Sequence, residues 1–356
     1  MSRATRATIS AGALEHNLQV LGRRAPGARL MAVIKANAYG HGLEAVARGL
    51  RQADAFAVAS AEEGLAVRAA GLAQPVVLLE GAFSPDDLAV AAREDFQLVV
   101  HSPEQLAMLE AFSGGALAFW LKVDTGMHRL GFRPEDARDA HARLQQHARR
   151  RGPVGLMTHL ARADEPGAPG VAAQLAVFGA FADLSGPRSI ANSAATLALP
   201  ATHADWVRPG LALYGISPFP GRSGADEGLR PAMALETRLI AVRAVRAGEP
   251  VGYGARWTAP EDATIGIAAV GYGDGFPRHA PNGTVVLVGG RPAALVGRVS
   301  MDMIALDLRG HPQVEVGASV ELWGAGAPIE PLARAAGMIP YELTCGVTQR
   351  VRHDVV

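Results

Sequence analysis

Residues 30–42 read Leu-Met-Ala-Val-Ile-Lys-Ala-Asn-Ala-Tyr-Gly-His-Gly. An unbroken apolar run, Leu30–Ile34, ends at Lys35, and a polar loop that contains two glycines follows. Runs that are apolar at every position are typical of parallel strands that are covered on both faces. The stretch therefore predicts a buried strand with a lysine at its carboxyl end.

The same pattern recurs up to about Gly224. Seven further apolar runs lie at Ala55–Ala59, Val76–Leu79, Gln97–Val100, Ala118–Val123, Val154–Thr158, Arg188–Ala191 and Trp206–Leu213. The intervening helical stretches are Leu43–Gln52, Ala61–Ala70, Pro85–Arg93, Pro103–Phe112, Pro134–Arg150 and Val171–Leu184, and an amphipathic helix from Ser10 to about Arg24 precedes the first run. Eight strands that alternate with helices predict a (β/α)8 barrel. A doubly wound open sheet is the alternative, and it is disfavoured because no Gly-x-Gly-x-x-Gly follows a strand.

Every one of the eight predicted strands ends in a polar residue. These residues are Lys35, Ser60, Glu80, His101, Lys122 with Asp124, His159, Asn192 with Ser193, and Arg208. The active sites of such barrels lie at the carboxyl ends of the strands. The sequence therefore predicts a ring-shaped active site at that end of the barrel.

After about Gly228 the pattern changes to Val-rich strands and glycine turns. Val285–Val288, the turn Gly289-Gly290 and Ala293–Val296 predict a hairpin. Alternating residues predict strands at Thr237–Val245 and Ile304–Leu308, and a short helix is predicted at Pro331–Ala336. With a linker at 218–228, we expect a barrel domain over residues 8–226 and a β-rich domain over residues 227–356, against which residues 1–7 can also pack.

Composition narrows the class of protein. Of the 356 residues, 49% are hydrophobic and 19% are charged, which is typical of a globular enzyme. Lys plus Arg and Asp plus Glu both number 34, so no charge excess points to nucleic acid or to a membrane. Cys345 is the single cysteine, and the first ten residues lack the apolar core of a secretion signal. We therefore expect a cytoplasmic enzyme without disulfides.

Lys35 is the first candidate for chemistry. Burial lowers the pKa of a lysine and makes its amine a nucleophile that can form a Schiff base. Its position alone is equally consistent with a lysine whose amine extends from the barrel rim into water.

Several further motifs decide between these interpretations. They are residues 32–42, 121–131, 158–161, 191–194, 207–215, 251–254, 271–275, 299–302 and 339–342. In this order, and over nearly the whole chain, they resemble the bacterial alanine racemases, a family that depends on pyridoxal 5'-phosphate (PLP). The resemblance implies a homodimer that interconverts L-alanine and D-alanine, with each active site shared between the two subunits.

The resemblance also implies roles for single residues. Lys35 binds PLP and acts as the base on one face of the substrate, and Tyr253 acts on the other. Tyrosine needs a nearby cation to act as a base near neutral pH, and His159 is its matching neighbour. Arg208 contacts the pyridine nitrogen of PLP. The remaining cofactor-binding groups, mostly for the phosphate, are Tyr39, Asn192, Ser193, Gly210, Leu211 and Tyr341, although Ser193 can also be read as a helix cap.

Substrate binding follows in the same way. The resemblance assigns the substrate carboxylate to Arg129 and to the backbone N–H of Met301, and it implies that Lys122 carries a carbamate that orients Arg129. Tyr272 and Asp302 are supporting residues. Asp164, Tyr272, Ile339 and Tyr341 line the channel to the site. No metal ion is expected.

Two positions depart from the family pattern, and some alternatives stay open. His128 stands where many members have glycine, and Ser189 stands where some have a histidine that supports the pyridine-binding arginine. A racemase of another small amino acid such as serine, a PLP-binding barrel without racemase activity, and a lysine-dependent aldolase are the alternatives. The sequence does not distinguish a biosynthetic from a catabolic role.

Overall fold

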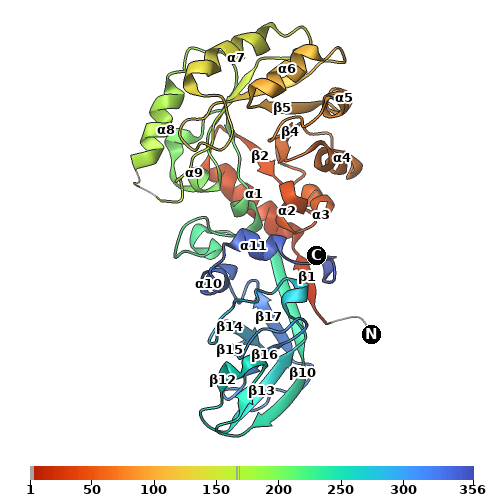
Figure 1. Cartoon of the computed structure of the whole chain (residues 1–356), viewed down its shortest axis with the longest axis vertical. Coiled ribbons are helices and arrows are strands. Elements are labelled where there is room, and N and C mark those ends of the chain that lie inside the picture. The colour runs from red at the N-terminus through yellow and green to blue at the C-terminus, as the bar shows by residue number, and fades with distance from the viewer. Residues whose placement is uncertain (1–3, 166, 168) are drawn as a thin grey trace.

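The computed structural model describes residues 4–165, 167 and 169–356. A barrel ringed by helices lies above an elongated β domain (Figure 1). The predicted fold class, a (β/α)8 barrel followed by a mostly β domain, is confirmed. The position of the domain boundary, between residues 226 and 227, stays a prediction.

Eight parallel strands close the barrel in chain order. They are β2 (Arg29–Val33), β3 (Ala55–Val58), β4 (Val76–Leu78), β5 (Phe96–Val100), β6 (Ala118–Lys122), β7 (Gly155–Met157), β8 (Arg188–Ser189) and β9 (Trp206–Val207). Each lies within one residue of a predicted run or inside it, and β9 closes the ring by pairing with β2. The last prediction was too long, because Pro209 has no N–H for a strand ladder and the chain turns there into a 3-10 helix, η2 (Leu211–Tyr214).

Helices cover the outside of the barrel. They are α1 (Ala11–Arg24), α2 (Lys35–Tyr39), α3 (Leu43–Gly49), α4 (Ala61–Ala69), α5 (Pro85–Glu94), α6 (Pro103–Ala111), α7 (Pro134–Gln146), α8 (Pro169–Gly179) and α9 (Ser193–Ala198), with 3-10 turns η1 (Pro200–Thr202) and η3 (Gly224–Glu227). Local sequence explains several starts, since Ser10, Ser84 and Ser102 accept hydrogen bonds from backbone N–H groups of the helices that they precede. Short α2 was not predicted.

The second domain is built on one sheet of eight strands, in the order β13-β16-β15-β14-β17-β10-β1-β18. Its strands are β1 (Arg6–Ile9), β10 (Met233–Val245), β13 (Ala263–Ala268), β14 (Val285–Val288), β15 (Arg291–Val296), β16 (Ile304–Asp307), β17 (Ser319–Trp323) and β18 (Arg352–Val355). Beside it lie the pair β11 (Pro250–Val251) and β12 (Trp257–Thr258), helices α10 (Ile329–Ala335) and α11 (Pro340–Cys345), and 3-10 turns η4 (Tyr253–Ala255) and η5 (Tyr272–Asp274). The predicted glycine hairpin is the turn between β14 and β15.

The N-terminal strand β1 lies in the sheet of the second domain, although it precedes the barrel in sequence. It pairs antiparallel with β10 and parallel with β18. Arg6 and Ala7 of the segment that we expected to pack with this domain are therefore in its sheet, whereas residues 1–3 lie outside the described part.

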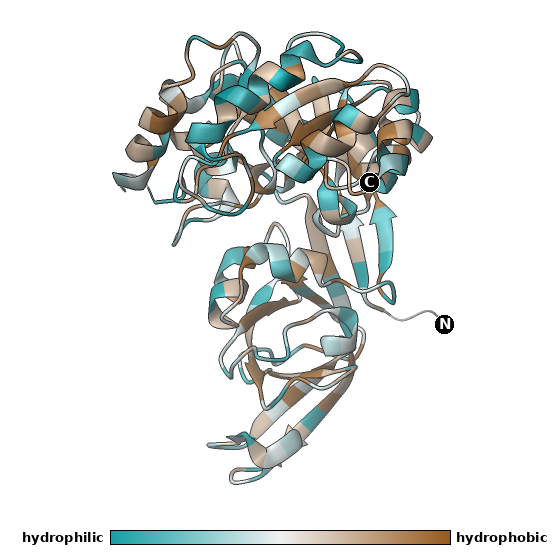
Figure 2. Cartoon of the chain, turned by 45° about the horizontal axis from the view of Figure 1, so that its top comes forward, coloured by the Kyte–Doolittle hydropathy of each residue, from teal (hydrophilic) through white to brown (hydrophobic). Residues whose placement is uncertain are grey.

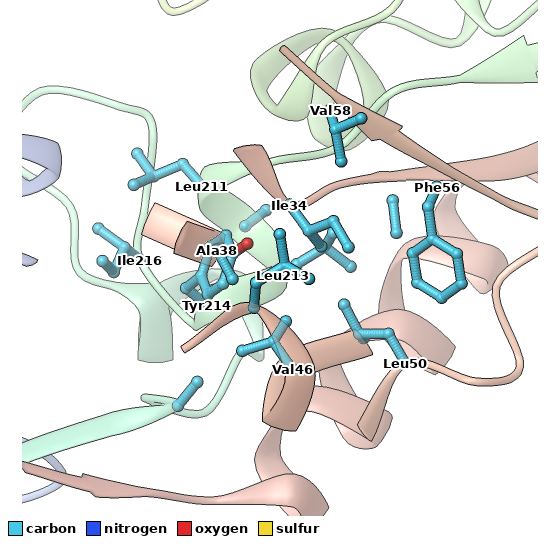
Figure 3. Close-up of a cluster of buried hydrophobic side chains, with 14 of the residues drawn as sticks. Ile34, Ala38, Val46, Leu50, Phe56, Val58, Leu211, Leu213, Tyr214 and Ile216 are labelled. Atoms are coloured by element: carbon cyan, nitrogen blue, oxygen red, sulfur yellow. The ribbon is translucent and has the colours of Figure 1, made fainter. Parts of the chain in front are cut away.

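Hydrophobic residues form the interior of the barrel, and Figure 2 shows its strands largely in the hydrophobic colour. Ile34 and Ala38, on either side of Lys35, point into a buried cluster with Val46, Leu213 and Tyr214 (Figure 3). The packing of these two side chains therefore fixes the backbone that carries Lys35. Within the described residues, no helix is long and apolar enough to cross a membrane.

Candidate active site

Charged residues gather at the carboxyl end of the barrel strands. Lys35 follows β2, Lys122 ends β6, His159 follows β7 and Arg208 follows β9. The Nζ atom of Lys35 lies 3.9 Å from an oxygen of Glu80, which follows β4. Because all eight strands run parallel, their ends place these side chains around one opening.

Lys122 is buried in this ring of charge. Burial, and then the nearby cations Arg208, Arg129 and Lys35, lower the pKa of Lys122 to about 8. A sizeable fraction of its amine is therefore neutral near pH 8. Lys35 and Lys122 are also the only lysines among the 34 Lys and Arg residues of the chain. The chain thus uses arginine for every other cation and keeps lysine at the two positions of this site, where an amine can lose its proton.

His159 is surrounded by the same cations. Burial, followed by Arg208, Lys122, Arg129 and Lys35, lowers the pKa of His159 well below its usual value of 6.5. Its Nδ1 atom lies 3.4 Å from Nη2 of Arg208 and accepts, because an arginine can only donate. This lowered pKa favours the neutral form of His159 at pH 7. The role of His159 as the neighbour of a tyrosine base stays a prediction.

The chain leaves Lys35 in a strained turn. Ala36, Asn37, Ala38 and Tyr39 all have φ between 51° and 53°, so α2 is one turn of left-handed helix. For residues other than glycine and asparagine, this conformation costs roughly 1–2 kcal/mol each. Such strain persists only where the surroundings determine the backbone. One part of those surroundings is α11, which packs so closely that a Cβ on Gly40 would meet the carbonyl oxygen of Thr344 at 2.0 Å.

Four predicted cofactor-binding residues lie together at this turn. Ser193 Oγ accepts from the N–H of Gly210 at 2.9 Å, and a Cβ on Gly210 would meet the Tyr39 hydroxyl at 2.5 Å. The ring of Tyr39 also lies 5.5 Å from that of Tyr341. The helix cap is Asn192 rather than Ser193, since the Asn192 side chain accepts from the first turn of α9. Hydroxyls and a bare glycine backbone thus form a cradle of the kind that binds an anion.

Arg208 is fully buried and held from three sides. It donates to Ser189 Oγ and to the carbonyl of Thr158, both at 2.6 Å, as well as lying near His159. Ser189 Oγ in turn donates to the carbonyl of Trp206 at 2.9 Å. Burial lowers the pKa of Arg208 to about 10, so the guanidinium stays protonated at pH 7. Ser189, one of the two departures from the family pattern, therefore supports the arginine directly.

The second departure also has a structural reason. His128 has a φ of 55°, which explains why glycine suits this position and why histidine is tolerated better than most residues. Its Nδ1 lies 3.0 Å from Asp124, which also accepts from the backbone N–H of His128. Arg129 follows and is exposed, and it lines a small cavity together with Lys122, Thr158 and His159.

Tyr341 reaches the turn of Lys35 within one chain, whereas the other predicted residues of the second domain lie on loops for which the described residues show no contact to Lys35. Tyr253 lies between β11 and β12, and Figure 1 shows β12 in the half of the β domain away from the barrel. Tyr253 is 71% exposed and Met301 is 52% exposed. The Met301 carbonyl accepts from the N–H of Gly273, beside Tyr272, and Asp302 accepts from Arg350 at 2.5 Å. These loops therefore form a second, exposed cluster.

Comparison with known proteins identifies the family. The descriptions "Alanine racemase, N-terminal domain" and "Alanine racemase, C-terminal domain" match residues 9–218 and 232–355. The chain belongs to the alanine racemase family. It is 51% identical to an alanine racemase of Halorhodospira halophila over 100% of this chain and 99% of that protein, and 50% identical to a biosynthetic alanine racemase of Escherichia coli over 98% of both.

Solved structures agree. The crystal structure of biosynthetic alanine racemase from Pseudomonas aeruginosa matches with a TM-score of 0.97 and 47% identity, over 99% of both chains. Alanine racemase from Acinetobacter baumannii matches with a TM-score of 0.93 and 36% identity, over 99% of this chain and 100% of that one. The predicted family and the predicted class of enzyme, an amino-acid racemase, are confirmed.

Two residues of the site were missed from sequence. Tyr214 stacks on Tyr39 with ring centroids 4.9 Å apart and donates to the carbonyl of Val33. Glu63 accepts from the N–H of Ala36, directly after Lys35. A tyrosine in an apolar run and a glutamate in the first turn of a helix are both common, so neither gave a signal.

Proposed function

We propose that this protein interconverts L-alanine and D-alanine, with PLP bound at Lys35 and with each active site completed by a second copy of the chain. The observation that carries the proposal is the position of Lys35, at a strand end between an anion cradle and a buried, charged Arg208. Racemisation needs a proton removed from one face of the substrate Cα and returned on the other, which calls for two acid–base groups.

The residues present fit PLP. The bare backbone of Gly210 lets the Tyr39 hydroxyl approach closely, since a Cβ there would lie 2.5 Å from it, and the hydroxyls of Tyr39 and Ser193 are donors that suit a phosphate. Leu211, Asn192 and Tyr341 flank these groups. When it is bound, PLP supplies the electron-withdrawing group that acidifies the Cα–H bond of an amino acid.

Arg208 is the residue that would bind the pyridine ring of PLP. Its contacts with Ser189 and the carbonyl of Thr158 fix the guanidinium, and because arginine keeps its proton it can only donate to the pyridine nitrogen. That nitrogen therefore remains unprotonated. A weaker electron sink favours simple proton return over side reactions such as transamination.

Lys35 and Tyr253 of the partner subunit act as the two acid–base groups. The amine of Lys35 moves a proton on one face, and the phenol oxygen moves a proton on the other. The exposure of Tyr253, Met301 and Tyr272, three large side chains on loops of the second domain, supports a dimer, because a partner subunit can cover side chains of this kind. Head-to-tail contact of two chains would place each loop cluster over the other barrel.

Arg129 and the backbone N–H of Met301 of the partner subunit bind the substrate carboxylate. Lys122 lies beside Arg129, and its pKa near 8 leaves a neutral amine that can take up CO2 as a carbamate. The chain uses lysine only at positions 35 and 122 and arginine elsewhere. This choice favours such a role for Lys122, since an arginine would serve if only a cation were needed. The resulting anion would orient Arg129, with Asp302 and Tyr272 supporting the loop.

Since two of the relatives above are called biosynthetic, we further propose that the enzyme acts in the cytoplasm and supplies D-alanine for peptidoglycan. The test is incubation of the purified holoenzyme with L-alanine in D2O, followed by chiral analysis and by measurement of deuterium at Cα. D-alanine that carries deuterium supports racemisation by proton exchange. Turnover of serine but not alanine would favour a serine racemase, and no turnover of either would contradict the proposal.

A further inference from the structure

The direction of the Lys35 side chain depends on what holds the left-handed turn that follows it. Some contacts come from the turn and the loop after it. The side chain of Asn37 accepts from the N–H of Leu43 at 2.9 Å, and Nδ1 of His41 donates toward the carbonyls of Ala38 and Tyr39. A further contact comes from a separate helix, α4, and it acts on the first peptide after the lysine.

That contact is made by both oxygens of one carboxylate. Glu63 Oε1 accepts from the N–H of Ala36 at 2.7 Å, and Oε2 accepts from the N–H of Ala59 at 2.8 Å. Strands β2 and β3 pair in parallel up to Val33 and Ala57. Beyond this point the strands part, and the carboxylate of Glu63 joins their two ends in place of the missing ladder.

We propose that Glu63 is a positioning residue for Lys35. Its carboxylate fixes the peptide that leaves Lys35 and thereby keeps the amine directed at the cofactor cradle rather than into solvent. The inference rests on the proposed function, in which Lys35 binds PLP. Glu63 acts through the backbone of Ala36 and touches neither cofactor nor substrate.

A simpler role for Glu63 must be distinguished from this one. Glu63 lies in the first turn of α4, where any carboxylate stabilises the helix through its dipole. Glu62, its neighbour in the same turn, is exposed and shares this dipole effect, but has no contact with the Lys35 turn among the hydrogen bonds of the described residues. Glu62→Gln is therefore the matched control for Glu63→Gln, in which the amide offers one acceptor where the carboxylate offers two.

The experiment measures the affinity of each protein for PLP by absorbance titration, and its melting temperature with and without PLP. For Glu63→Gln we expect PLP to bind about tenfold more weakly, which corresponds to about 1.4 kcal/mol. The stabilisation by PLP should shrink accordingly. Glu62→Gln should match the wild type in both. If Glu63→Gln lowers the melting temperatures with and without PLP equally and leaves the PLP affinity unchanged, Glu63 only stabilises the helix and the proposal is overturned.

A second variant supplies a rescue. Glycine adopts the φ of 53° at position 36 without the steric cost of alanine. Adding Ala36→Gly to Glu63→Gln should therefore recover part of the lost PLP affinity, whereas a helix-stabilising role predicts no recovery. If Glu63→Gln does not fold, hydrogen exchange of the wild-type Ala36 amide decides, since exchange as fast as that of a free loop amide contradicts the proposal. Wild-type protein that takes up no PLP would refute the proposed function as well.

Discussion

The barrel mouth and the loops of the β domain carry the two halves of the proposed site, and they differ in burial: the residues of the mouth are buried and those of the loops are exposed. At the mouth, Lys122 and Arg208 are buried. Burial lowers the pKa values of Lys122, Arg208 and His159, and neighbouring cations lower those of Lys122 and His159 further. In the loops, Tyr253 and Met301 are more than half exposed. The mouth therefore holds the groups that bind and tune a cofactor, and the loops hold groups that act on something outside their own chain. Each prediction below breaks one half or sharpens the contrast between them.

The largest effect should come from removing the amine of the barrel mouth. Lys35→Ala deletes both the proposed cofactor attachment and one acid–base group, so racemisation should fall at least about 10^4-fold. Because the chain has only one other lysine, borohydride reduction of the holoenzyme followed by peptide mapping gives a direct readout. The wild type should carry reduced cofactor on the Lys35 peptide and Lys35→Ala should carry none. Label on Lys122 would contradict the assignment.

Tyr253→Phe breaks the loop half and leaves the mouth intact. PLP should bind as in the wild type, while racemisation falls by about 10²–10⁴-fold, the usual contribution of one acid–base group. Each base serves one face, so solvent deuterium should still enter one enantiomer of alanine faster than the other. Thr258→Val, at an exposed position of the neighbouring strand β12 and outside the predicted site, is the control. Loss of PLP binding in Tyr253→Phe would show that the two halves are not separable.

Lys122 should make the stability of the protein depend on pH. The free energy of unfolding of the wild type is compared with that of Lys122→Arg in CO2-free buffer. The pKa of Lys122 is about 8 in the folded protein and near the ordinary 10.5 in the unfolded chain. Between these values the unfolded chain binds a proton that the folded protein does not, so stability rises with pH. The free energy of unfolding of the wild type should gain about 3 kcal/mol over that of the variant from pH 8 to 10.5. A constant difference would mean that the pKa of Lys122 is not lowered.

The smallest effect concerns the support of Arg208. Ser189→Ala removes an acceptor from a buried guanidinium, which should lower the free energy of unfolding by about 1–3 kcal/mol. Ser185→Ala removes an exposed hydroxyl that, among the described residues, accepts a hydrogen bond from Gln145 alone, at 3.3 Å, and this change should cost about 0.5 kcal/mol or less. Chemical denaturation measures both. Equal stability of the two variants would show that the Ser189 hydroxyl does not stabilise the buried Arg208.

Much of the fold was predictable because parallel strands and their covering helices have distinct periodicities. The strand ends with Lys35, Lys122 and Arg208 stood out for the same reason, as charges after apolar runs. The prediction failed where apolar residues stop pairing, as at Leu211–Tyr214, where Pro209 ends the ladder but the run of hydrophobic residues continues.

Other features had no local signal. The left-handed turn at Ala36–Tyr39 contains no glycine, and the tertiary contacts of Glu63 and α11 that help to hold it leave no pattern in the local sequence. The lowered pKa of His159 comes first from burial and then from four cations in distant parts of the sequence. Residue roles such as that of Tyr253 came from the family resemblance, since an exposed tyrosine between two short strands indicates no chemistry by itself.

The central claim, that each site combines the mouth of one chain with the loops of another, is tested most directly by subunit complementation. Lys35→Ala and Tyr253→Phe chains, each inactive alone, are co-expressed in equal amounts, purified as a mixture and assayed for racemisation. If sites are shared, half of the dimers are mixed and each mixed dimer has one intact site, so about a quarter of the wild-type activity should return. If the mixture stays as inactive as its components, Lys35 and Tyr253 serve the same site from one chain and the account is wrong.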